Sequence, residues 1–572
     1  MEAETCGSGP VWVSEALRIL GDALVGSCAP STVWFKESSQ KNLRSRDFLV
    51  PRGALKRSFP DGEVPADLVQ TLMSLAAPGL PPVKTCLQSE AGLIVQLDRP
   101  AVFRRVLQDF SPYLQPLPSV DDGQDIVILN CAPLHGCRSL DTLRLSHLRA
   151  VLVADHLAKV LTLKGKQVSL VPARLCKEVD EFLSHLGISW PRSGDAASLE
   201  DTVSSFKDFL RDYIQDSRHV DSAPGVLCVL LKTFAEKHNI CLRGYDPNLD
   251  FFTVDEGDLE HVARLQRSVL EAMQMSPGMV LHIVSSEEEF HQQKLDLLWR
   301  LIVPSNGDVT QKHLICGPVK ALNSATPIGC SQYFQLRKSQ MLEASVMKYG
   351  ERVQGESWEE IINSLTSAAI KFELMATPHR SRVNLNLEEA NITTKGTKSG
   401  AFVMYNCARL ATMFDSYKGA VSQGTYPEFP PAADLNYSSL REQGAEVVKQ
   451  RSCSVLDGCL LGLEHNFCFI TQGEWLLLFN YVMMFPEVLS QSAQMSASSP
   501  GIRVTANTES VCKFLVRLSM DFSCYYNRVH ILGEPLPHLF SQMFARLQLM
   551  KAVQSVLHSA LKTLHILPLT QI

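Results

Sequence analysis

The sequence lacks the short motifs that mark most known catalytic sites. It contains no G-x-x-x-x-G-K-[ST] phosphate loop, no G-x-S-x-G nucleophile motif, no H-E-x-x-H zinc helix and no glycine-rich dinucleotide loop. Histidines and carboxylates are present, but no spacing pairs them as an acid and a base. Motifs alone therefore give little support for an enzyme.

The cysteines also lack a metal-binding or disulfide pattern. The chain has 16 cysteines but no C-x-x-C pair, and neither Cys131 with Cys137 nor Cys453 with Cys459 has a matching second pair. A structural zinc site needs such clustered ligands, so we predict no metal and no cofactor. Scattered cysteines are typical of free thiols in a reducing compartment.

Long hydrophobic runs and a signal peptide are missing as well. The most apolar stretches are too short to cross a bilayer, and the N-terminus carries acidic residues where a signal peptide carries basic ones. Hydrophobic residues make up 45% of the chain, which is typical of a folded protein. We expect a cytoplasmic protein, and a nuclear pool stays open as an alternative.

Positive charge is not in excess overall. The formal net charge is −6, so any binding to nucleic acid has to use local patches. The strongest local excess is the basic stretch, residues 34–57, with seven basic and two acidic side chains among Trp34, Phe35 and Phe48. It is either a solvated loop or a phosphate-contacting patch. The candidate phosphate contacts are Lys41, Arg44, Arg46 and Arg52.

Hydrophobic periodicity divides the 572 residues into regions of different fold class. Residues 92–98 alternate like a half-buried strand and precede a helix that starts near Pro100, so the N-terminal region is predicted to be α+β. From residue 125 to about 171, a strand, a helix and a strand follow one another, as in a parallel α/β sheet. Residues 191–205 and 423–439 are expected to be loops.

Beyond residue 357 the apolar residues recur every three to four positions, which predicts an all-α helical bundle. The last predicted helix covers residues 540–564 and has one long apolar face. Its opposite side carries a basic stripe, formed by Lys551, His558 and Lys562.

The order of these regions resembles that of arginyl-tRNA synthetases. The segments "GAFVMYNCARLATMF", "LLLFNYVMMFPEVLSQSA" and "FSCYYNRVHIL" resemble successive helices of their DALR anticodon-binding domain. The segment "HLRAVLVADHLAKVLTLKGKQV" resembles the one after their nucleotide-binding signature. The resemblance implies an N-terminal domain like the one that binds the tRNA elbow (1–115), a degenerate Rossmann-like domain (116–356) and a DALR helical domain (357–572).

Both ATP-binding signatures of that family depart from their usual form. Arg144, Leu145, Ser146 and His147 stand where the synthetases have H-x-G-H, so only the second histidine is kept. Residues 333–335 are Tyr-Phe-Gln where the K-M-S-K loop is expected, and Lys338 is the nearby lysine. A mobile lysine at that loop stabilises the phosphate charge of the transition state. We therefore expect that adenylation is lost.

The whole pattern resembles the DALR anticodon-binding domain-containing protein 3 family, which is derived from arginyl-tRNA synthetases. The resemblance implies a non-catalytic adaptor that presents arginine tRNAs to an S-adenosylmethionine-dependent methyltransferase, which forms 3-methylcytidine in the anticodon loop. Neither DNA nor a membrane is an expected partner. Two alternatives stay open: a divergent but active arginine-tRNA ligase, and a protein-interaction scaffold that does not bind RNA.

The resemblance also assigns roles to the stretch "DFSCYYNRVHILGEP", residues 521–535. Tyr526 is expected to stack on a splayed loop base, with His530 one turn later on the same helix face. Asn527 could read a base edge, or it could cap or pack. Tyr405 and Arg409 match a second helix facing the same loop, and Lys551 and Lys562 would add backbone contacts. The neighbouring Tyr525 is expected in the core, and a purely structural role for the whole set stays open.

Overall fold

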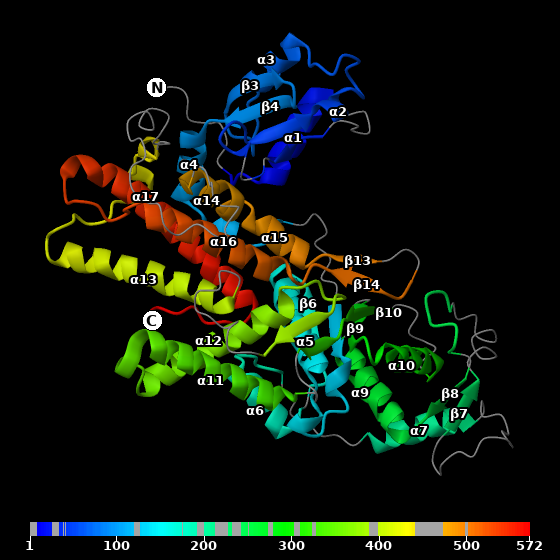
Figure 1. Ribbon diagram of the computed structural model, residues 1–572. Coiled ribbons are helices and arrows are strands. Elements are labelled where there is room, and N and C mark those ends of the chain that lie inside the picture. Colours follow the sequence, from blue (N-terminus) through cyan, green and yellow to red (C-terminus); the bar gives the residue numbers. More distant parts are fainter. Residues whose placement is uncertain are drawn as a thin grey trace.

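A computed structural model gives the arrangement of the chain (Figure 1). The N-terminal domain lies at one end, the C-terminal helices lie in the middle, and the parallel sheet with its helices lies at the other end. Lys41, Cys453 and Cys459 fall outside the described residues. The structure describes residues 9–25, 34–37, 39, 42–118, 126–173, 175–191, 199–211, 227–230, 242–249, 251–272, 278–302, 309–322, 328–387, 399–440, 473–497 and 501–571.

The N-terminal domain packs helices against an antiparallel sheet with the strand order β1-β2-β4-β3. The predicted strand and the helix near Pro100 are confirmed as β4 and α4. The strands β3 and β4 form a hairpin, and β2 pairs with β4 on its other side. The elements are α1 (Val13–Val25), β1 (Lys36–Glu37), β2 (Phe48–Pro51), α2 (Arg52–Leu55), α3 (Ala66–Ser74), β3 (Val83–Ser89), β4 (Gly92–Leu97) and α4 (Arg99–Gln108).

The middle domain is built on a parallel sheet with the strand order β10-β9-β5-β6. The predicted strand–helix–strand unit is confirmed as β5, α5 and β6. Its elements are β5 (Ile126–Cys131), α5 (Leu145–Leu163), β6 (Gln167–Val171), α6 (Lys177–His185), α7 (Glu200–Arg211), β7 (Leu227–Leu230), β8 (Phe251–Val254), α9 (Glu256–Ala272), β9 (Gly278–Ser285), α10 (Glu289–Ile302), β10 (Val309–Cys316), β11 (Val319–Leu322) and α11 (Cys330–Tyr349).

One loop prediction in this domain is wrong in part. Helix α7 starts at Glu200, because residues 200–211 carry an apolar face that buries Val203, Phe206 and Leu210. The strand β7 pairs with β8 in a separate antiparallel ribbon instead of joining the parallel sheet.

The C-terminal domain is mainly helical, with a few short strands. The predicted helix near its end is confirmed as α17, and β12 pairs with β11 of the middle domain. None of the described helices combines the length and the apolar character needed to cross a membrane. The elements are α12 (Glu356–Met375), β12 (Val383–Asn386), α13 (Gly400–Ser422), α14 (Gly473–Leu477), a π-helical turn (Leu478–Val482), α15 (Phe485–Ser492), β13 (Met495–Ala497), β14 (Val504–Ala506), α16 (Ser510–Arg528) and α17 (Pro537–Thr563).

The loop predicted at 423–439 has little regular structure, but it is not simply exposed. Leu435 and Tyr437 are buried, and Tyr437 is fully inaccessible to solvent. The turn around Tyr437 packs against α17 and α4. The apolar side chains of this loop therefore help to join the helical and N-terminal domains.

A buried guanidinium joins the middle domain to the helical domain. Arg149 lies within α5 and is fully buried. It donates hydrogen bonds to the carbonyl oxygens of Gly317, Leu374, Thr377, Pro378 and Ser381, over 2.5 to 3.2 Å. Burial lowers its pKa from the usual value of an arginine. These five carbonyl groups hold the end of α12 against the central helix.

A buried ion pair joins the N-terminal domain to the helical domain. Asp47 is fully buried and accepts hydrogen bonds from Arg99 at 3.0 Å, from the indole of Trp475 at 2.9 Å and from the backbone of Leu97 at 2.8 Å. The guanidinium of Arg99 also lies 4.9 Å from the centre of the Trp475 ring. Burial raises the pKa of Asp47, and the charge of Arg99 opposes this shift.

This arrangement predicts that Asp47 is needed for stability. Asp47→Ala leaves Arg99, whose side chain is only 15% exposed, without its carboxylate, so the free energy of unfolding should fall by up to about 3–5 kcal/mol. Asp61→Ala removes an exposed carboxylate of the same domain and should change it by less than about 0.5 kcal/mol. Urea unfolding followed by tryptophan fluorescence measures both variants, and equal stabilities would contradict the anchoring role of Asp47.

Candidate functional site

Four of the residues predicted to bind RNA meet where α13 and α16 pack together. The guanidinium carbon of Arg409 lies 4.4 Å from the ring centre of Tyr526 and 5.5 Å from that of Tyr405. Arg409 also donates to the side-chain oxygen of Asn527 and, at 3.2 Å, to the hydroxyl of Ser523. We call Tyr405, Arg409, Tyr526 and Asn527 the tyrosine–arginine cluster.

Local packing explains why α13 presents these side chains. The hydroxyl of Ser399 caps the helix by accepting from the backbone N–H of Phe402 at 3.3 Å. At Gly400 an added Cβ would lie 2.4 Å from the carbonyl oxygen of Ala368 in α12, so only glycine allows this close approach. Tyr405 and Arg409 follow one turn apart on the half-buried side of α13.

The prediction that Tyr525 lies in the core is confirmed. Its ring is buried, and its hydroxyl donates to Glu474 at 3.2 Å. Glu474 is also paired with Arg546 of α17 at 2.7 Å. The Tyr525 ring fills the space where a Cβ on Gly473 would stand, at 2.3 Å from its Cδ2 atom. Tyr525 therefore fixes α16 against α14, while the half-buried Tyr526 lies beside it.

A lysine that the sequence analysis did not identify also belongs to this surface. Lys348, at the end of α11, is exposed, and its ammonium group lies 4.7 Å from the ring centre of Tyr405 and 4.8 Å from that of Tyr349. Within the described part of the chain, no carboxylate forms an ion pair with Lys348 or Arg409. The surface therefore combines aromatic faces with cations, as single-stranded RNA sites do.

The cluster differs from its prediction in two respects. His530 was expected on the same helix face as Tyr526, but α16 ends at Arg528 and Val529 is extended. His530 is exposed and lies beyond the helix, so the predicted i, i+4 arrangement is wrong. Arg409 also lies against the Tyr526 ring, so a base would stack on the guanidinium plane or displace it.

The structure separates the aromatic residues of the basic stretch from its cations. Phe35 and Phe48 belong to the core of the N-terminal domain, because β2 pairs with β4 and turns Phe48 inward. Trp34 is 49% exposed, and Arg44 is exposed on the loop before β2. Arg46 and Arg52 are half-buried as whole residues.

Arg52 and the basic stripe on α17 differ in exposure. The guanidinium of Arg52 pairs with Glu63 at 3.6 Å, and both side chains are largely accessible to solvent. On α17, Lys551 and Lys562 are exposed, whereas His558 between them is half-buried, and burial lowers its pKa. The stripe therefore offers two lysines, about 16 Å apart along the helix.

The N-terminus of α5, where the first ATP signature was expected, is occupied by ion pairs of the protein itself. Arg144 pairs with Glu287 and with Glu288, each at 2.8 Å, and His147 contacts Glu288 at 2.8 Å. Burial would raise the pKa of Glu288, but His147 and Arg144 outweigh it and hold the pKa below its usual value. Ser146 is buried and accepts a hydrogen bond from the first residue of β11. Two carboxylates thus lie where a helix N-terminus would favour a phosphate.

The position expected for the second signature lies inside a regular helix. Tyr333 and Phe334 are buried in α11, and the hydroxyl of Tyr333 donates to Glu373. Burial raises the pKa of Tyr333 well above its usual value. The ammonium group of Lys338 pairs with Glu359 at 3.3 Å. These residues hold α11 on α12 and do not form a mobile loop over a nucleotide.

A row of buried polar side chains crosses the parallel sheet. His282 and His313 are register partners on β9 and β10, and with Asp296 they place ligand-type atoms within 4.8 Å of one another. Each already has a partner within the protein: His313 contacts Asp296 at 2.9 Å, and His282 contacts Gln311 at 2.9 Å. Burial lowers the pKa of His282 to about 4. We interpret the row as a buried hydrogen-bond network that stabilises the sheet.

Comparison with known families and structures agrees with this architecture. Residues 11–113 match the family described as "DALR, N-terminal domain", and residues 445–572 match the "DALR anticodon binding domain". The second match includes α16 but begins after α13, so only part of the tyrosine–arginine cluster lies within it.

Full-length relatives and a solved structure extend the comparison. "DALR anticodon-binding domain-containing protein 3" of Mus musculus is 42% identical over 581 residues, covering 99% of this chain and 100% of the relative. The protein of the same name from Danio rerio is 40% identical over 596 residues, with the same coverage. The arginyl-tRNA synthetase of Thermus thermophilus has a TM-score of 0.57 at 14% identity, covering 98% of this chain and 100% of the synthetase, so this likeness shows the fold.

The N-terminal domain, the parallel sheet and the helical domain thus form an arginyl-tRNA-synthetase-like fold. Identity at this level over nearly the whole length of both chains is specific to one family. The chain therefore belongs to the DALR anticodon-binding domain-containing protein 3 family.

Proposed function

We propose that this protein is a non-catalytic tRNA-binding adaptor in the cytoplasm. It would recognise arginine tRNAs through its DALR domain and present them to an S-adenosylmethionine-dependent methyltransferase that forms 3-methylcytidine in the anticodon loop. The observation that carries the tRNA-binding part is the tyrosine–arginine cluster, in which Arg409 lies against two half-buried tyrosine rings. The choice of tRNA and of enzyme partner follows from the family resemblance.

The cluster suits an unpaired RNA loop in chemical terms. Splayed bases stack on aromatic rings or on arginine planes, and each such stack is worth about 1–3 kcal/mol. Asn527 is exposed and lies next to the rings, where its amide could meet a base edge. The exposed ammonium group of Lys348 lies beside the Tyr405 ring, so it could contact the phosphate of a nucleotide whose base stacks there.

Internal ion pairs favour the adaptor over the ligase alternative. ATP binding at α5 would require Glu287 and Glu288 to leave Arg144 and His147, because phosphate oxygens and carboxylates repel each other. The buried Tyr333 and Phe334 take the place expected for a mobile lysine loop. The scaffold alternative differs in its lack of RNA affinity, which a gel shift with total tRNA measures directly.

Substitution at Tyr526 tests the proposed loop contact. Tyr526→Ala removes one ring from the cluster, so the affinity for the preferred arginine tRNA should fall by about 1–3 kcal/mol, tenfold or more. Affinity for other tRNAs should hardly change, because phosphate contacts dominate those complexes. Filter binding measures both, and methylation of the preferred tRNA by the partner enzyme should fall in parallel.

Two matched variants separate stacking from folding. Tyr526→Phe keeps the ring and most of its packing against Phe522 (5.5 Å between ring centres), so it should bind nearly as well as the wild type. Arg409→Lys keeps the positive charge but loses the planar guanidinium group on which a base could stack, and it should weaken binding as Tyr526→Ala does. Equal weakening for every tRNA, or a large drop in the melting temperature of Tyr526→Ala, would assign the cluster to the helix core.

An exchange assay tests whether catalysis is lost. Arginine-dependent ATP–pyrophosphate exchange by the full chain should be at least 10²–10³-fold below that of a bacterial arginyl-tRNA synthetase measured beside it, since even one missing transition-state contact costs this much. Exchange within tenfold of the control enzyme would support the divergent ligase instead.

Salt dependence tests the basic stretch. If Arg44, Arg46 and Arg52 contact phosphates, replacing each by alanine should weaken all tRNAs alike and flatten the log–log salt slope by up to about one unit per contact. Arg18 of the same domain is an exposed control, and it is already paired with Glu15 at 2.6 Å. A slope that stays unchanged in the triple variant would remove this stretch from the tRNA interface.

A further inference from the structure

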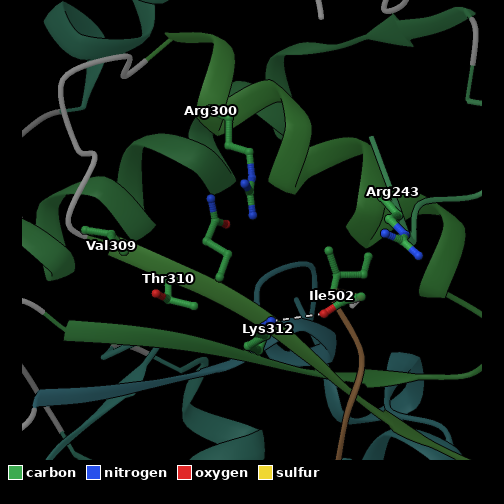
Figure 2. Close-up of a pocket in the computed structure, with 8 residues that line it drawn as sticks. Arg243, Arg300, Val309, Thr310, Lys312 and Ile502 are labelled. Carbon is green, nitrogen blue, oxygen red and sulfur yellow. Dashed lines mark hydrogen bonds between the residues drawn. The ribbon is translucent and has the colours of Figure 1, made fainter. Parts of the chain in front are cut away.

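An open cavity of about 380 Å³ lies at the edge of the parallel sheet, over the first residues of β10 (Figure 2). Three parts of the chain line it: the segment 242–249, the unit formed by α10 and β10, and residues 501–502 just before β14. The cavity is at the amino end of β10, whereas the degenerate nucleotide position at α5 lies beyond the carboxyl ends of the strands. It is therefore separate from the ATP site that the fold would predict.

Three cations are among the described residues that line the cavity. Arg243 is exposed, Arg300 points toward the cavity from α10, and Lys312 lies on β10 (Figure 2). No carboxylate is among the described residues that line it. The hydroxyl of Thr310, which is exposed, adds a neutral hydrogen-bond donor on the same side of β10 as Lys312.

Two of the cations are held in position by the protein. The ammonium group of Lys312 donates to the carbonyl oxygen of Gly501 at 2.9 Å. The Nε atom of Arg300 donates to Asp296 at 2.9 Å, and its guanidinium lies 5.8 Å from the ring centre of Tyr245. Fixed cations lose little side-chain entropy when an anion arrives, so the geometry is already organised for binding.

The acidic groups described near the cavity are held by contacts within the protein, and one of them, Asp296, offsets the charge of Arg300. Asp296 is buried, and its other oxygen accepts from Tyr245 at 2.7 Å and contacts His313 at 2.9 Å. His313 and Arg300 outweigh the effect of burial and keep the pKa of Asp296 below its usual range. Asp246 lies in the same segment as Arg243, and its carboxylate accepts from the backbone of Asn248 at 2.9 Å. Among the described residues, the cavity therefore has an excess of positive charge, carried by Arg243 and Lys312, because Asp296 offsets Arg300.

We propose that this cavity binds a phosphate group. Two arginines and a lysine from three segments match the charge and the several acceptor oxygens of a phosphate, and guanidinium groups bind such oxygens in pairs. The phosphate can come from the backbone of a bound RNA or from a small phosphorylated molecule, since both present the same chemistry. Binding would tie the segment 242–249 to the edge of the sheet, to which residues 501–502 are already bonded.

Titration of the full-length chain with pyrophosphate tests the site directly by calorimetry. Saturable binding is expected, and Arg243→Ala and Thr310→Glu should each weaken it about tenfold or more, through loss of a charged hydrogen bond or through repulsion. Both side chains are exposed, so the melting temperature should stay the same. Lys177→Ala, at an 88% exposed lysine at the start of α6, is the matched control and should bind as the wild type does.

Competition identifies the source of the phosphate. If tRNA displaces pyrophosphate and Arg243→Ala flattens the salt dependence of tRNA binding, the group comes from an RNA backbone. If tRNA and pyrophosphate bind together, the group comes from a small molecule. Absence of saturable pyrophosphate binding, or equal affinity in all variants, would overturn the proposal. The titration needs no tRNA, so it remains decisive even if the adaptor function fails its own test.

Discussion

The fold depends on one buried charge, the guanidinium of Arg149. An arginine keeps its proton even where burial disfavours it, and so it must find acceptors within the protein. Here the acceptors are backbone carbonyl groups after β10 and at the end of α12. The loops that carry them cannot move away without leaving the charge unsolvated. The sheet and the helical domain are thereby fixed to each other where α12 ends.

Charged groups that find partners within the protein have opposite effects at the start of α5 and at the tyrosine–arginine cluster. At α5, Arg144 and Glu288 satisfy each other and occupy the place of a nucleotide. At the junction of α13 and α16, Arg409 finds aromatic faces and an amide, and it keeps its full positive charge near solvent. The first site is closed by its own residues, while the second remains available to an outside ligand. The proposed loss of catalysis and the proposed RNA binding are thus compatible within one fold.

The sequence predicted the long elements well, because an apolar face repeated over many residues has few alternatives. It also separated the core residue Tyr525 from its neighbour correctly. It failed where the outcome depends on distant partners. Phe48 is buried because β2 pairs with a strand more than forty residues away, and Lys348 reaches Tyr405 from another helix. His530 was misplaced because no glycine or proline marks the end of α16. The domain boundaries stay predictions.

Two neighbouring pairs of residues connect the helical domain to the N-terminal domain. Tyr525 adjoins Tyr526 of the cluster and holds Glu474 of α14, and the next residue, Trp475, bonds to Asp47 of the N-terminal domain. The cluster and the basic stretch are therefore parts of one rigid body and lie at a fixed distance from each other. An RNA that contacts both surfaces would need a folded length that matches this distance. If both surfaces bind the proposed tRNA, an isolated stem-loop could contact only one of them, and the three-dimensional fold of the RNA would then contribute to selection in addition to its bases.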